Sequence, residues 1–316
     1  MDFKQNIKIM QRALARYGLF GTNWLLVRLP YSMVRGLTRV FIAIGYRFTI
    51  KQRKIAQESL RIAFGQQKNP AEINLITKKC FENIGQGMTE MLYFMAHPQW
   101  LNQKILWEGR EHLDTTLKKN RGVIAVTAHF GNFPLMMLAC SKAGYRCNAI
   151  IRPTRDQELE KFLLKKRRES DLQTVYAIPR RSCVDQSLKA LRKNEVLFIP
   201  LDQNFGSGGG VFVDFFGQKA ATATGPVVFA LRTEAPILPM FIVRQKEDVH
   251  KIIIEPPLTL EKGNDDQETI KINITKLTNL IERYIRKYPQ EWGWMHRRWK
   301  SRPSFESAPA ASDSLI

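Results

Sequence analysis

The feature that most constrains the fold is an alternation of short apolar runs with longer amphipathic stretches between residues 109 and 287. The apolar runs have the length of β-strands, whereas the stretches between them repeat apolar residues at helical spacing. The expected strands are residues 123–128, 147–151, 174–178, 196–201, 237–243 and 251–255. The expected helices are residues 134–143, 156–170, 183–193, 224–233 and 268–287. This alternation predicts an α/β fold with a mostly parallel central sheet flanked by helices.

The N-terminal region combines positive charge with apolar stretches. The first 54 residues carry eleven Lys and Arg and a single acid, and the apolar stretches lie at 17–27 and 40–46. Arginines such as Arg28 and Arg39 interrupt any run of the roughly 20 apolar residues that a membrane-spanning helix needs. The pattern predicts one or two amphipathic helices in a membrane interface. A basic arm packed on its own domain and a tilted span with snorkelling arginines are the alternatives.

The chain divides into three parts. Residues 1–52 are the expected membrane-associating helical segment, and residues 53–303 are the expected α/β domain. That domain begins with two helices over 53–96, joined by a turn at 65–70. Residues 304–316, rich in Ser, Ala and Pro, predict a disordered tail.

The charge balance indicates an acidic partner. Lys and Arg number 49 against 29 Asp and Glu, a net charge of +20, which suits nucleic acid, an anionic membrane or an acidic protein. No known nucleic-acid module occurs, and the positive charge is richest beside the apolar N-terminal stretches, so we expect a membrane and no nucleic acid. The four cysteines have no disulfide or zinc spacing, which predicts reduced, mostly buried thiols in a cytosol-facing protein.

His129 is the first candidate for chemistry. It follows the apolar run 123–128 directly, and Gly131, Pro134 and a new apolar run come after it. This order predicts a strand, a tight turn and a helix, with the imidazole at the carboxyl end of a strand, where α/β proteins bind their ligands. An imidazole can also take and return a proton near neutral pH. A lone histidine in the core is the plain alternative.

Further polar residues follow other expected strands. Arg152 comes after one strand, Asp202 and Gln203 come after another, and a glycine-rich stretch lies at 206–225. Each alone has an ordinary explanation, such as an ion pair for Arg152 or a turn cap for Asp202. Because the carboxyl ends of parallel strands share one edge of a sheet, their joint placement predicts a single site.

These motifs, in this order, resemble the bacterial lipid A biosynthesis acyltransferases, within the wider glycerolipid and lysophospholipid acyltransferase superfamily. The resemblance runs from about residue 28 to 303. Its motifs are His-Phe-Gly-Asn at 129–132, Arg152, Leu-Asp-Gln at 201–203, Phe-Phe-Gly at 215–217 and Trp-Gly-Trp-Met-His-Arg-Arg-Trp-Lys at 292–300. It implies O-acyl transfer from an acyl carrier protein or coenzyme A thioester to a lipid hydroxyl. It also implies a membrane-anchoring N-terminus at the cytoplasmic face of the bacterial inner membrane.

One position departs from the family pattern. The family places an acid five positions after the histidine, and here that position is Pro134. An orienting carboxylate can be worth about 10⁴ in rate. Asp202 is the first candidate to replace it and Glu90 the second, and a backbone carbonyl could also hold the imidazole. Otherwise the chain would be a slow or inactive relative that binds lipid.

The resemblance assigns His129 the role of general base, which removes the proton of the acceptor hydroxyl. Backbone N–H groups near Phe130, Gly131 and Asn132 are the expected oxyanion donors. Arg152 is the expected ligand of an acceptor phosphate.

Asn132, Asp202 and Gln203 are expected to shape the rim of the site. The acyl chain needs an apolar slot, for which Phe133, Met136 and Met137 are available. No metal or redox cofactor is expected, because the acyl thioester is the co-substrate.

Two basic stretches, 161–168 and 296–302, favour an acidic carrier protein or anionic headgroups, and a solvated basic surface is the alternative. A lipid A precursor is the acceptor that the resemblance implies. A lysophospholipid, or another glycolipid or aminolipid, is the alternative acceptor.

Overall fold

The computed structural model describes residues 10, 13, 16–18, 20–25, 28–65, 67–206 and 210–303. The expected tail at 304–316 and part of the glycine-rich stretch therefore lie outside the described residues. The four cysteines are free and buried, as the sequence predicts.

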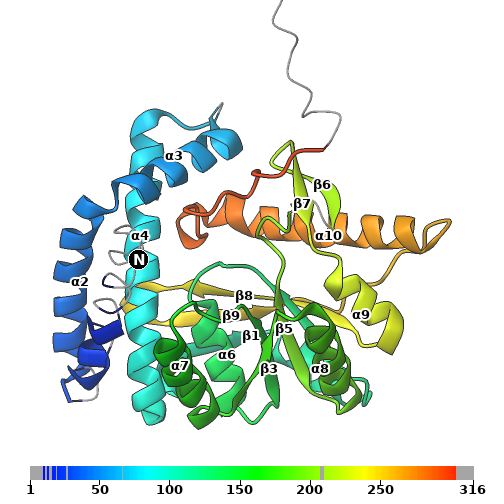
Figure 1. The fold of residues 1–316 in the computed structure, drawn as a ribbon, viewed down its shortest axis with the longest axis horizontal. Helices are drawn as coiled ribbons and strands as arrows, with labels where there is room; N and C mark the ends of the chain where they lie inside the picture. The colour runs from blue at the N-terminus through cyan, green and yellow to red at the C-terminus, as the bar shows by residue number, and fades with distance from the viewer. Residues whose placement is uncertain are drawn as a thin grey trace, which may run out of the picture.

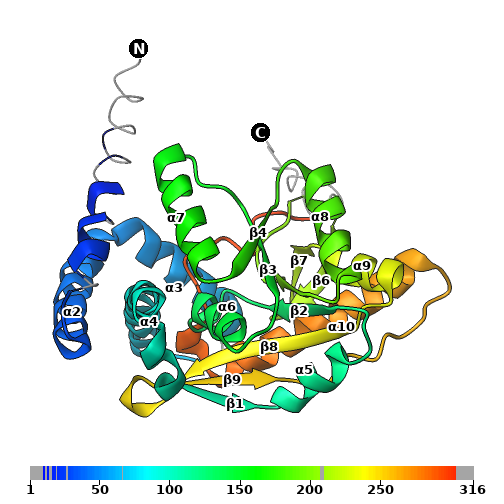
Figure 2. The ribbon, with the colours of Figure 1, turned by 90° about the horizontal axis from the view of Figure 1, so that it is seen from below.

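A seven-stranded sheet forms the centre of the molecule (Figures 1 and 2). Its strands are β1 (Ile105–Glu108), β2 (Val123–Thr127), β3 (Cys147–Ile151), β4 (Leu172–Tyr176), β5 (Val196–Pro200), β8 (Ile237–Arg244) and β9 (His250–Ile254). Their spatial order is β1-β9-β8-β2-β5-β3-β4. Of these neighbouring pairs, β8 and β9 run antiparallel and the others run parallel. The predicted mostly parallel α/β sheet is confirmed.

Helices cover both faces of the sheet, and this explains the continuous apolar runs of the central strands. The helices that follow strands are α5 (Arg110–Leu117), α6 (Phe133–Lys142), α7 (Gln157–Glu169), α8 (Arg180–Arg192), α9 (Gly225–Thr233) and α10 (Asp266–Lys287). All five residues of β2 are buried, and they alternate between two cores. Ile124 and Val126 face the core that contains residues of α8, α9 and α10. Val123 and Ala125 face the core that contains residues of α5 and α6.

Three helices precede the sheet: α2 (Tyr31–Phe48), α3 (Ile50–Phe64) and α4 (Pro70–Ala96). Helix α2 lies alongside α4 (Figure 1), and Gly85 permits this close approach, because a Cβ there would lie 2.6 Å from Ile42. The boundary expected at residue 52 falls within α3. None of the helices formed by the described residues is long and apolar enough to cross a bilayer.

Strand β1 and a hairpin in the glycine-rich stretch were not predicted from the sequence. Strands β6 (Val211–Phe215) and β7 (Gln218–Thr222) pair antiparallel, with Phe215 opposite Gln218. Phe216 and Gly217 form the two-residue turn and both have positive φ, as a type I′ hairpin turn requires. Most of the glycine-rich stretch is therefore a hairpin. Strand β4 also begins and ends two residues earlier than expected, and α8 begins at Arg180.

Candidate active site

The register of two central strands brings His129 and Asp202 together. In the parallel pair of β2 and β5, Thr127 lies opposite Pro200. The pairing continues past the strand ends, since the N–H of Leu201 donates to the carbonyl of Thr127 at 2.9 Å. His129 and Asp202 each stand two residues beyond those strand partners. They therefore meet at the carboxyl edge of the sheet.

Their side chains form a hydrogen-bonded pair. His129 Nδ1 lies 2.9 Å from Asp202 Oδ1, and the indole Nε1–H of Trp292 donates to Asp202 Oδ2 at 2.7 Å. Asp202 is buried, whereas the His129 side chain is 31% exposed. An imidazole that donates from Nδ1 to a carboxylate carries its lone pair on Nε2. The pair thus presents a basic nitrogen from a fixed ring.

The surroundings of this pair shift both pKa values. Burial lowers the pKa of His129, but the nearby charge and hydrogen bond of Asp202 outweigh burial and raise it above the ordinary value. Burial raises the pKa of Asp202, but the charge and hydrogen bond of His129, the charge of His296 and the bond from Trp292 together hold it well below the usual range. Asp202 therefore stays ionised while His129 titrates.

A cavity of about 400 Å³ adjoins His129. It lies among α4, α6, α7 and β3, and Figure 2 shows these helices side by side. Its lining is mostly apolar, and its basic side chains are Arg152, Lys166 and Arg167. Arg152 is exposed and forms no ion pair with the residues that the structure describes. The cavity therefore combines an apolar interior with an unneutralised guanidinium.

Two of the three residues expected to form an acyl slot face this cavity. Phe133 and Met137 line the cavity, whereas Met136 is buried in the core and is absent from the lining. Pro134 also lines the cavity, in the first turn of α6, where a missing N–H costs little. The position of the family acid is thus an apolar wall here. The second carboxylate candidate, Glu90, binds Asn132, Arg244 and His250 instead of His129.

The expected oxyanion and rim residues lie in different surroundings. The N–H of Gly131 donates to the carbonyl of Glu291 at 2.7 Å, so it is not free for an oxyanion. The Asn132 side chain is buried and caps α6, so it does not shape the rim. Gln203 is exposed and is absent from the cavity lining. The backbone N–H groups of Phe130 and Asn132 remain from the expected donor set.

The C-terminal tryptophan motif packs against the His129 turn. Besides the bond from Gly131, the N–H of Gly293 donates to the carbonyl of His129 at 3.0 Å. These two bonds form an antiparallel bridge between Phe130 and Trp292. The turn is therefore held by backbone groups far away in the sequence.

The motif is partly interior. Of the cations in the basic stretch 296–302, Arg297, Lys300 and Arg302 are exposed, whereas Arg298 is buried. Arg298 and Trp299 are buried, and Arg298 donates to the carbonyls of Gln203 and Ala221 and to the hydroxyl of Thr222. It thereby ties the loop that follows Asp202 to β7. Composition gives no sign that these residues support the site. The resemblance, which identifies the motif, was the available signal.

No group of three or more His, Cys, Asp or Glu side chains among the described residues is placed to hold a metal ion. The ionisable groups at the site are the imidazole of His129, its carboxylate partner Asp202 and the basic side chains of the cavity.

Comparisons with known proteins identify the family of the chain. The family model for bacterial lipid A biosynthesis acyltransferases matches residues 1–301. The lipid A biosynthesis lauroyltransferase of Escherichia coli K12 is 29% identical over 294 residues, which cover 90% of each chain. The lipid A biosynthesis palmitoleoyltransferase of the same organism is 28% identical over 306 residues, which cover 93% of this chain and 94% of the relative.

A solved structure, the 1-acyl-sn-glycerophosphate acyltransferase of Thermotoga maritima, covers 84% of this chain and 97% of its own at 15% identity, with a TM-score of 0.38. The family assignment depends on the family model, which spans nearly the whole chain, including the His129 turn and the tryptophan motif. The chain therefore belongs to the bacterial lipid A biosynthesis acyltransferases.

Proposed function

We propose that this protein transfers a fatty acyl chain from a thioester to a hydroxyl of a lipid A precursor, with His129 as the general base. The observation that carries the proposal is the His129–Asp202 pair beside an apolar cavity. Asp202 takes over the role of the acid missing at Pro134, because it orients the imidazole and stabilises the imidazolium.

The reaction follows from the orientation of the imidazole. Nε2 of neutral His129 accepts the proton of the acceptor hydroxyl, whose oxygen attacks the thioester carbonyl. The tetrahedral intermediate expels the thiolate, which takes the proton back from Nε2. The new ester remains on the lipid, and the carrier leaves as a thiol. The N–H groups of Phe130 and Asn132 are the proposed donors to the oxyanion.

The cavity supplies the binding groups. Its apolar lining, which includes Phe133 and Met137, suits the acyl chain, and Arg152 suits an acceptor phosphate because it lacks an ion-pair partner among the described residues. Acyl carrier protein is the proposed donor, because it is an acidic protein and this chain carries a net charge of +20. Exposed cations for such a partner are Lys161, Lys165, Arg168, Arg297, Lys300 and Arg302.

A membrane surface is the proposed location, at the cytoplasmic face of the bacterial inner membrane. The outward face of α2 exposes Phe41 and Phe48, at 68% and 81%. Arg39 and Arg47 of the same helix line a hollow with Lys78 and Glu82 of α4. Apolar side chains flanked by cations suit the boundary between acyl chains and anionic headgroups.

The proposal is tested with purified protein, acyl carrier protein loaded with acyl chains of several lengths, and a lipid A precursor. We expect mass spectrometry to detect one added acyl chain with wild type and none with His129→Ala. Asp202→Asn should lower kcat by roughly 10³- to 10⁴-fold. Full activity of His129→Ala would refute the role of base. A wild-type protein that binds the precursor without acylating it would support a lipid-binding relative instead.

The pH profile gives a second readout. His129 must be neutral to act, so activity should fall as the pH drops through its pKa, which Asp202 raises. Asp202→Asn removes that attraction, so the acid limb of its residual activity should move to lower pH. An unmoved limb would mean that another group titrates.

A further inference from the structure

A buried carboxylate lies at the centre of a network on the other side of the His129 turn. Glu90 of α4 receives hydrogen bonds from both terminal nitrogens of Arg244, at 2.6 and 2.8 Å. His250 Nε2 lies 3.0 Å from the same carboxylate, and the hydroxyl of Tyr31, at the start of α2, donates to it at 3.3 Å. Burial raises the pKa of Glu90, but His250 and Arg244 lower it to about 2. Glu90 is therefore a charged group deep in the protein.

The fourth partner of this carboxylate is Asn132. Its amide nitrogen donates to Glu90 Oε2 at 3.2 Å and to the carbonyl of Gly87 at 3.1 Å. Its amide oxygen accepts the N–H of Leu135 at 3.3 Å and so caps α6. A side chain at Gly87 would crowd this amide, since a Cβ there would lie 3.3 Å from the Asn132 Cγ. Both ends of the amide are thus engaged, and its orientation is fixed.

Asn132 stands three residues after His129, at the end of the turn that carries the imidazole. Backbone bonds to Glu291 and Gly293 hold the first part of the turn. The amide of Asn132 holds its last part and reaches α4 through Glu90 and Gly87. The Phe133 ring, next in sequence, packs edge-on against the His129 ring with centroids 4.9 Å apart. A displaced Asn132 would therefore move both the turn and the ring that supports the imidazole.

We propose that Glu90 is a positioning residue, which fixes the His129 turn through the side chain of Asn132. This inference rests on the proposed role of His129. Glu90 does not contact the imidazole, so it does not replace the family acid as a proton partner. It acts by holding the scaffold on which His129 and Asp202 meet, where a displacement of about 1 Å can cost on the order of 100-fold in rate.

The first experiment distinguishes the hydrogen bond between Asn132 and Glu90 from the cap that Asn132 provides to α6. In Asn132→Ser the hydroxyl can still cap α6, and Glu90 keeps its charge, but serine is too short to reach Glu90. We expect kcat to fall roughly tenfold to 100-fold with little change in KM. We also expect the pKa of His129, followed by NMR of its imidazole, to fall toward the ordinary value. Unchanged kcat and unchanged His129 pKa in this variant would overturn the proposal.

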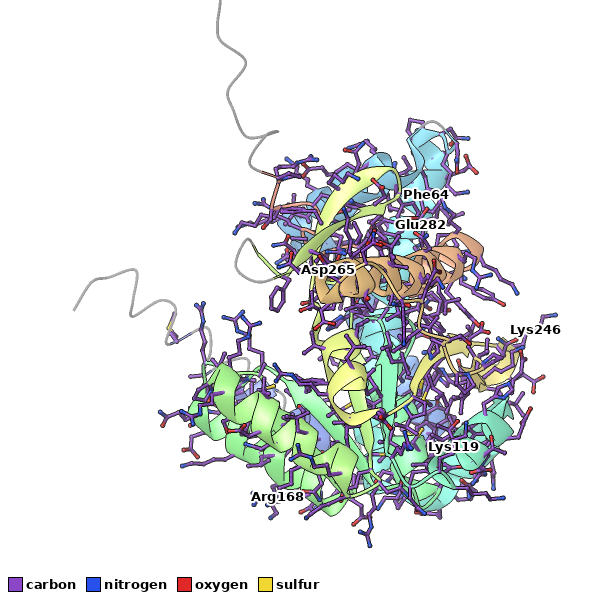
Figure 3. The ribbon with its side chains drawn as sticks, turned by 90° about the vertical axis from the view of Figure 1, so that its right-hand side faces the viewer. Phe64, Lys119, Arg168, Lys246, Asp265 and Glu282 are labelled. Carbon is purple, nitrogen blue, oxygen red and sulfur yellow. The ribbon has the colours of Figure 1, made fainter. Side chains whose placement is uncertain are left out.

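A matched control tests for general destabilisation. Glu282 of α10 is a partly buried glutamate that likewise has polar partners, since it accepts the N–H of Phe216 and pairs with Arg286. Figure 3 shows it near Phe64, at the end of the molecule opposite Arg168. Glu90→Gln should lower kcat, whereas Glu282→Gln should lower the melting temperature without changing kcat or the His129 pKa. Equal losses of kcat in both variants would assign Glu90 a merely structural role.

A double variant tests the contact itself. Asn132→Asp keeps the cap but faces Glu90 with a second carboxylate, so its kcat should fall further than that of Asn132→Ser. When Glu90→Gln is added, the amide introduced on α4 can donate to the carboxylate introduced at position 132, and kcat should rise above that of Asn132→Asp alone. If the fold-losses in kcat of Asn132→Asp and Glu90→Gln multiply in the double variant, the proposal is overturned. The NMR measurement needs no turnover, so it tests this link even if His129→Ala stays active and the proposed function fails.

Discussion

Helix α2 and the C-terminal motif have a similar composition but opposite surroundings. Both mix aromatic and apolar residues with arginines, and both suggested contact with acidic or membrane partners. In α2, Phe41 and Phe48 are among the most exposed apolar side chains of the described residues. In the motif, Trp292, Trp294 and Arg298 are 0% exposed. Composition alone therefore does not tell a docking surface from an interior support.

The backbone explains the difference. Helix α2 satisfies its own N–H and C=O groups, so one face can pack on α4 while the other stays exposed. Residues 291–299 form no long helix, and their backbone groups need partners elsewhere. The N–H of Gly293 donates to the carbonyl of His129, and the carbonyl of Glu291 accepts the N–H of Gly131. Their indoles then find acceptors at Asp202, Pro289 and Phe215. Because this irregular segment is buried, its polar groups must find their partners within the protein.

The largest expected effect of a single substitution lies in the interior motif. Trp294→Ala should destabilise the protein by about 3–5 kcal/mol, as expected for a fully buried indole. Phe41→Ala in α2 should change the free energy of unfolding by less than about 0.5 kcal/mol, because the ring is exposed. Urea unfolding followed by circular dichroism measures both. Equal effects would mean that the two aromatic residues do not differ in burial.

A smaller change in the motif should affect catalysis rather than folding. Trp292→Phe keeps a ring but removes the donor to Asp202, and a hydrogen bond to a charged group is worth about 1.5–3 kcal/mol. We expect kcat to fall by roughly tenfold to 100-fold. The control is Trp100→Phe, since Trp100 is exposed on the short helix at 98–104 and should tolerate the change. Wild-type kcat in Trp292→Phe would show that Asp202 needs no second partner.

On the α2 side the expected effects concern membrane binding. Phe41→Ser should weaken binding to vesicles of anionic phospholipid by about 1.5 kcal/mol, roughly tenfold, if its ring enters the acyl region. Leu106→Ser on β1 is the control, because Leu106 is also an exposed apolar residue but lies outside α2. Vesicle flotation measures both. Equal retention of the two variants would argue against docking by α2.

The smallest expected effect comes from single cations. Arg39→Gln should cost about 1 kcal/mol of binding to the same vesicles, and added salt should remove the difference. Lys119→Gln, on the exposed turn after α5 (Figure 3), should have no effect. A loss that persists at high salt would point to a specific headgroup site formed by Arg39 with Arg47 and Lys78.

Much of the fold could be predicted because apolar runs and helical periodicity are local signals. The central strands and the later helices lie close to their expected ranges. The pairing of His129 with Asp202 was also within reach, since both follow strands that end at one edge. The hairpin was missed because its turn, Phe216-Gly217, lacks the usual Asn or Asp.

Other features of the site depend on contacts that no local pattern encodes. Trp292 reaches Asp202 across 90 positions of the chain, and Arg244 reaches Glu90 across 154. Asn132 looked like a rim residue because it follows His129, but its side chain turns toward α4. Partners of buried polar groups are set by the packing of whole elements, so residue type and neighbours could not identify them.

The backbone bridge between Phe130 and Trp292 has a consequence for the order in which the enzyme matures. During synthesis, the turn with His129 leaves the ribosome long before residues 291–293 exist to bind it. A nascent chain could build the strands around His129 and still lack the indole that binds Asp202. Catalytic competence would then arrive only once residues 291–293 have been made, after the helices proposed to meet the membrane.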